Sequence, residues 1–136
     1  MDDLHLVEAF PGLRVDGLWA AWTTVDGVTS FWADEAEIEL VPGGPYRLGW
    51  PSRSWTMDGE VLAVEPGVAL TFSWAWSHEP ETPTRSVGLQ FAASEGDVPG
   101  SELIIDHGPF GPDEATTRTE HQEGWQFFCQ ALRERH

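Results

Sequence analysis

The C-terminal stretch, residues 113–136, reads DEATTRTEHQEGWQFFCQALRERH and is the strongest indication of the fold. It contains no Pro, starts with acidic residues and ends with basic ones, a charge distribution that suits a helix dipole. One stripe along this helix recurs at intervals of four, three and four residues: His121, Trp125, Phe128 and Leu132. Gly124 weakens the middle of the helix, which indicates a close approach by a neighbouring sheet. The stripe predicts a long C-terminal helix that packs against a sheet.

Alternating polar and apolar residues predict the strands of that sheet. The clearest is LTFSWAW, residues 70–76, whose inward face is almost wholly aromatic, and another lies over 35–40. Further strands are expected at 4–10, 46–50, 55–64, 87–91 and 101–108, with loops at 78–83 and 95–100. Apolar residues at helical spacing predict two short helices after the first strand, over 15–22 and 25–32.

This order of elements predicts an α+β fold. A curved antiparallel sheet of about seven strands would wrap around the long C-terminal helix, because tight turns join consecutive strands and the helix must bury its stripe. A length of 136 residues is typical of one domain, which we place at 1–136.

Composition excludes several classes of function. The formal charge of -16, with 23 acidic and 7 basic residues, opposes binding to nucleic acid or to anionic membrane surfaces. No apolar stretch approaches the roughly 20 residues of a membrane span, so membrane insertion is not expected. The lone Cys129 cannot form an internal disulfide and the N-terminus does not resemble a signal peptide, which together favour the cytoplasm.

Several short motifs occur in an order shared with a known family: LWAAWT (18–23), FW (31–32), VPGGPYR (41–47), GEVLAVEP (59–66), LTFSW (70–74), SELIIDHGPF (101–110) and HQEGW (121–125). In these motifs the chain resembles the activator-of-heat-shock-ATPase-like family of the START-related (SRPBCC) superfamily. The resemblance implies the helix-grip fold, also called the birch-pollen-allergen (Bet v) type. It further implies a hydrophobic cavity between sheet and helix. Chaperone activation is not expected, since the co-chaperone that names the family carries an additional domain.

Ten inward-facing residues are candidates for contacts with a ligand in that cavity. They are Tyr46, Leu48, Trp50, Trp74, Trp76, Phe91, His107, His121, Trp125 and Phe128. Their aromatic rings suit a small hydrophobic or aromatic molecule, and the two histidines are the polar contacts. The alternative is that the aromatic residues fill the core and the histidines are satisfied within it.

Other chemistry has less support in the sequence. No Cys pair or HExxH spacing is present, so we expect neither a metal nor a cofactor. Arg53 and Arg85 are candidates for an anionic headgroup at the cavity mouth, unless they pair with surface carboxylates. Cys129 beside the helix stripe is expected to be buried rather than reactive.

Two further functions stay open. One is a cyclase- or hydrolase-like enzyme with a cavity histidine as general base, which requires a histidine paired with a carboxylate and open to the cavity. The other is a protein interaction module, in which a surface or sheet edge docks a partner or forms a homodimer.

Overall fold

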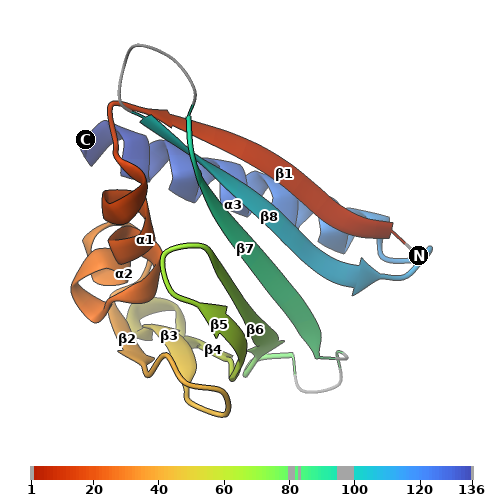
Figure 1. Ribbon diagram of the computed structural model, residues 1–136. Helices are drawn as coiled ribbons and strands as arrows, with labels where there is room; N and C mark the ends of the chain where they lie inside the picture. The colour runs from red at the N-terminus through yellow and green to blue at the C-terminus, as the bar shows by residue number, and fades with distance from the viewer. Residues whose placement is uncertain (1, 80–81, 83, 95–99, 136) are drawn as a thin grey trace.

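The computed structural model describes residues 2–79, 82, 84–94 and 100–135 (Figure 1). Its strands are β1 (Asp2–Pro11), β2 (Glu35–Ile38), β3 (Tyr46–Trp50), β4 (Trp55–Asp58), β5 (Val61–Glu65), β6 (Ala69–Trp76), β7 (Arg85–Ala93) and β8 (Gly100–Phe110). Its helices are α1 (Val15–Thr23), α2 (Val25–Phe31) and α3 (Ala115–Arg135), and the 3-10 turn η1 (Pro51–Arg53) follows β3. The predicted α+β helix-grip fold is confirmed, including both short helices. The loops expected at 78–83 and 95–100 contain residues outside the described ranges.

All the strands form one antiparallel sheet in the order β1-β8-β7-β6-β4-β3-β2, with β5 also paired to β6. Figure 1 shows the long strands β1, β8 and β7 running across α3, with α1 and α2 at one end of the sheet. The sheet therefore curves around α3, which contacts both β1 and β8.

The prediction of a single strand over 55–64 is wrong, because this segment divides into β4 and β5. Both parts pair with β6, Met57 opposite Trp76 and Val61 opposite Phe72. The break falls at Gly59, where a Cβ atom would lie 2.5 Å from two carbonyl oxygens of neighbouring strands. Only glycine allows so close an approach.

The two short helices pack tightly against each other. The Thr24 hydroxyl caps α2 by accepting a hydrogen bond from the Gly27 N–H at 2.9 Å. A Cβ at Gly27 would lie 2.2 Å from the Ala20 carbonyl oxygen, so glycine is required where α2 crosses α1. This contact places Trp22, Phe31 and Trp32 in one aromatic cluster against α3.

Helix α3 is anchored at its start and along one edge of the sheet. The Glu114 carboxylate accepts a hydrogen bond from the Gly111 N–H at 2.8 Å and pairs with the buried Arg85 guanidinium. Arg85 therefore lies inside the fold and pairs with a carboxylate, which is the alternative that the sequence left open for it. Toward the other end of α3, Arg133 donates to the Ala9 carbonyl oxygen of β1 at 2.7 Å.

Cys129 is buried on α3, as expected. Burial raises the pKa of its thiol to about 12, so the thiolate is scarce near neutral pH. No helix in the described part of the chain is both long and apolar enough to span a membrane.

Candidate functional site

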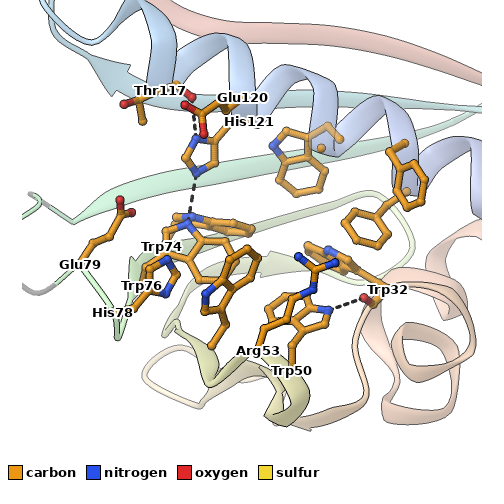
Figure 2. Close-up of a pocket in the computed structure, with 15 residues that line it drawn as sticks. Trp32, Trp50, Arg53, Trp74, Trp76, His78, Glu79, Thr117, Glu120 and His121 are labelled. Atoms are coloured by element: carbon orange, nitrogen blue, oxygen red, sulfur yellow. Dashed lines mark hydrogen bonds between the residues drawn. The ribbon is translucent and has the colours of Figure 1, made fainter.

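A pocket of about 610 Å³ opens between α3 and the β3, β4 and β6 end of the sheet (Figure 2). Its volume lies in the range that small-molecule sites occupy. The residues that line it are Trp32, Trp50, Arg53, Trp55, Trp74, Trp76, His78, Glu79, Thr117, Glu120, His121, Gly124, Trp125, Phe127 and Phe128.

Aromatic residues make up most of the pocket wall, and several of their indole N–H groups form hydrogen bonds inside the protein. The Trp50 N–H donates to the Trp32 carbonyl oxygen at 2.8 Å, and the Trp76 N–H donates to His121 Nε2 at 3.2 Å. The Trp125 N–H donates to His107 Nδ1 at 2.9 Å. These bonds fix the orientation of each ring, so the three indoles offer a ligand carbon surface rather than hydrogen bonds.

The hydrogen bonds of His121 determine where its proton lies. An indole N–H can only donate, so Nε2 of His121 accepts from Trp76 and carries no proton. Nδ1 then holds the proton and donates it to the Thr117 carbonyl oxygen at 2.8 Å. His121 is therefore a neutral, oriented group of the pocket wall.

His107 lies behind this wall and is fully buried. Because its Nδ1 accepts from Trp125, its proton is on Nε2, which has no hydrogen-bond partner among the described residues. The rings of His107 and His121 are 5.0 Å apart between centroids. Desolvation by burial lowers the pKa of His107 well below its usual value, and the nearby His121 and Arg85 lower it further.

We expect the free energy of unfolding to decrease as the pH falls below about 6.5, where both histidines titrate in the unfolded chain. In the folded protein the pKa of His121 is also lowered, mainly by burial. The unfolded chain therefore binds protons first, so the stabilisation is complete above pH 6.5 and is lost toward the lower pKa of the folded state. Urea titrations at several pH values check this.

His121→Gln is the control for this pH dependence, because the many carboxylates of the chain also respond to pH. The variant should show a smaller change in unfolding free energy between pH 7 and pH 5.5 than the wild type, at the same salt concentration. Identical pH profiles for the two proteins would contradict a contribution from His121.

Gly124 borders the open space of the pocket and is not packed against the sheet. A Cβ built at Gly124 would meet no atom within 4 Å, and the residue lines the pocket. The close approach by the sheet that the sequence suggested is therefore wrong. The glycine weakens a 21-residue helix without any packing need, and it leaves the helix backbone bare toward the pocket.

The structure brings six of the ten candidate residues to the pocket: Trp50, Trp74, Trp76, His121, Trp125 and Phe128. Four lie elsewhere. The Tyr46 ring stacks on Phe72, and its hydroxyl donates to the Trp22 carbonyl oxygen. Leu48 is buried in the core, Phe91 packs edge-to-face against Trp19, and His107 is separated from the pocket by the wall.

Other lining residues were not anticipated as contacts, and some had a signal in the sequence. Thr117, Glu120, Gly124 and Phe127 share a helix face with His121 at intervals of three and four residues. That face is rotated from the stripe that includes Leu132. Four other lining residues reach the pocket only through tertiary packing: Trp32, Trp55, His78 and Glu79. No local sequence pattern distinguishes them from residues outside the pocket.

Comparison with known proteins identifies the family. The family profile described as Activator of Hsp90 ATPase homolog 1-like protein matches residues 13–136. The chain belongs to this family. A search of curated proteins finds no matching sequence.

Several solved structures share the fold. Protein MLL2253 from Mesorhizobium loti has a TM-score of 0.80 at 21% identity, covering 96% of this chain and 94% of that one. The AHSA1 protein from Silicibacter pomeroyi has a TM-score of 0.74 at 22% identity, covering 98% and 96%. The Aha1 dimer from Colwellia psychrerythraea has a TM-score of 0.72 at 15% identity, covering 98% and 97%. Identities this low support the shared fold alone.

Proposed function

We propose that this protein binds a small hydrophobic or aromatic molecule in the pocket between α3 and the sheet. The observation that carries the proposal is the wall of six indoles around about 610 Å³, facing helix backbone left bare at Gly124. A solid core would place side chains in this space, and a flat ring fits between aromatic faces. The helix-grip fold of the family is consistent with a ligand in this position.

Binding is tested by native mass spectrometry of the purified protein and by a Trp-fluorescence screen. The panel contains fatty acids, flavonoids and polyketide-like aromatics. We expect saturable quenching by at least one aromatic member, because Trp74, Trp76 and Trp125 line the pocket. No bound mass and no quenching across the panel would contradict the proposal.

We expect His121→Ala to weaken binding of the quenching ligand by about tenfold while the protein stays folded. The substitution removes the acceptor that holds the Trp76 ring in place, and tenfold corresponds to about 1.4 kcal/mol. His5→Ala is the matched control, since His5 is exposed on β1 and outside the pocket. Unfolding of His121→Ala would instead support a structural role for this histidine.

The hydrogen bonds of the histidines favour binding over general-base catalysis. Nδ1 of His121 donates to a backbone carbonyl oxygen, and the lone pair on Nε2 accepts a hydrogen bond from Trp76. Both ring nitrogens are therefore already used. The one His–carboxylate contact among the described residues joins His5 Nδ1 to Asp106 Oδ1 at 2.6 Å, and both side chains are exposed outside the pocket. The enzyme hypothesis required such a pair at the cavity.

The sheet edges favour binding over an edge-docking module. Carbonyl oxygens of Asp3 and Ala9 on edge strand β1 accept hydrogen bonds from α3 arginines, at 3.4 and 2.7 Å. The edge strand β2 at the other end of the sheet order has only four residues, of which two are exposed Glu. Both features are typical of edges protected from strand addition.

Self-association is a separate proposal. The relative from Colwellia psychrerythraea is described as a dimer. The native mass spectra used for ligand detection also report whether this chain forms a dimer.

A further inference from the structure

We propose that the pocket selects an elongated aromatic ligand with two different polar ends. A hydrogen-bond acceptor or anionic group lies at Arg53, and a hydrogen-bond donor or cationic group lies at Glu79 and Glu120. This inference rests on the proposed function and adds the polarity of the ligand to it.

Arg53 provides the basic end. It closes the turn η1 after β3, and Figure 2 shows its guanidinium directed into the pocket on the Trp50 side. Its central carbon lies 5.2 Å from the centroid of the Trp55 ring. In contrast, Arg47, Arg85 and Arg133 each pair with a carboxylate.

Arg53 has no ion pair or side-chain hydrogen bond with the described residues, although the chain has 23 acidic residues. Its guanidinium therefore has donors free for a ligand. A planar acceptor such as a carboxylate matches their geometry and can accept two parallel hydrogen bonds.

Glu79 and Glu120 provide the acidic end. Glu79 follows β6 and Glu120 projects from α3, and Figure 2 places both on the His121 side, away from Arg53. Neither carboxylate forms an ion pair within the described part of the chain. Burial lowers the pKa of His121, whereas the Thr117 carbonyl and the charges of Glu79 and Glu120 act in the opposite direction. The negative charges of Glu79 and Glu120 therefore act on the His121 end of the pocket.

A ligand with a single charge fits this arrangement less well. A simple cation would suit the formal charge of -16 and the aromatic faces, but Arg53 already occupies the face of Trp55 and would repel it. A simple anion would meet Arg53 but also the two carboxylates. Because all three charged groups lie at the solvent-exposed rim, each end should contribute a modest gain in affinity.

Four naphthalene probes of nearly equal size test the inference by calorimetry at physiological salt. They carry a hydroxymethyl group, a carboxylate, an aminomethyl group, or a carboxylate and an aminomethyl group at opposite ends. We expect the bipolar probe to bind at least about tenfold more tightly than the neutral hydroxymethyl probe. The two singly charged probes should fall between them.

Two variants assign each end. Arg53→Gln should remove the advantage of the carboxylate, and the double variant Glu79→Gln/Glu120→Gln should remove the advantage of the aminomethyl group. The affinity of each variant for the neutral probe is the baseline against which these advantages are measured. Arg14→Gln and Glu39→Gln/Glu65→Gln are matched controls, because they change the net charge equally at exposed residues outside the pocket.

Two results would overturn the inference. If the neutral and bipolar probes bind equally, the pocket binds aromatics without regard to polarity. If the variants leave the rank order unchanged, Arg53, Glu79 and Glu120 do not select the polar ends. Either result overturns the inference, and the proposed function survives. If none of the four probes binds, the proposed function fails and this inference fails with it.

Discussion

Gly124→Leu is expected to abolish binding of the aromatic ligand without destabilising the protein. A Cβ atom at Gly124 would meet no atom of another element within 4 Å, and Gly124 lines the pocket. Leucine would therefore occupy the space of the ligand, and we expect the dissociation constant to rise by at least about a hundredfold, which is about 2.7 kcal/mol. Removing a glycine from a helix interior stabilises it by about 1 kcal/mol, so the melting temperature should not fall. Fluorescence titration and thermal unfolding measure the two effects.

Gln126→Leu is the matched control, since Gln126 is exposed on α3 and does not line the pocket. It should leave the dissociation constant unchanged. Gly124→Ala should keep part of the affinity and most of the gain in stability. Wild-type affinity in Gly124→Leu would show that the ligand lies elsewhere.

Trp125→Ala is expected to lower the free energy of unfolding by about 3–5 kcal/mol, the usual cost of truncating a buried Trp. Trp125 is 4% exposed, and its ring lies 5.3 Å from Trp32 and 5.6 Å from Trp74 between centroids. It joins α3 to the sheet and to α2 in one cluster. Since domains are stable by only about 5–15 kcal/mol, urea unfolding should show a large shift of the midpoint.

Trp125→Phe separates packing from hydrogen bonding. It keeps an aromatic ring but removes the N–H that donates to His107 Nδ1 at 2.9 Å. An unsatisfied buried acceptor costs about 1–3 kcal/mol, so this variant should lie between the wild type and Trp125→Ala. Trp55→Phe at the exposed rim should change stability by less than about 0.5 kcal/mol. Equal effects of Trp125→Phe and Trp55→Phe would show that the bond to His107 contributes little.

Helix α3 contains residues that hold it to the fold and residues that border the pocket, and Trp125 does both. Trp125, Cys129 and Leu132 are its buried residues and hold the helix to the fold. His121, Gly124 and Phe128 face the pocket. A helix optimised for stability alone would carry alanine or leucine at position 124, so the glycine supports a role for the open space.

Three features follow from the sequence alone: the order of the elements, the long helix α3 and the inward direction of His107. Each of these depends on periodicity within a short segment, because a period of two or of 3.6 residues reports which side of a strand or helix faces the core. The division of the predicted strand into β4 and β5 at Gly59 cannot be predicted in this way, because it depends on carbonyl groups of Tyr46 and Ser73 that approach from other strands.

The division of the inward residues between the core and the pocket depends on the tertiary structure. Periodicity gives Tyr46 and Trp50 the same inward direction, yet Tyr46 packs on Phe72 and Trp50 borders open space. The difference arises from the separation between α3 and the sheet, which depends on contacts between distant residues. The Trp76 bond to His121 spans 45 positions of the chain, and the Trp125 bond to His107 spans 18. Patterns within a short segment do not predict contacts between residues so far apart in the chain. The pocket therefore cannot be predicted until the position of the helix against the sheet is known.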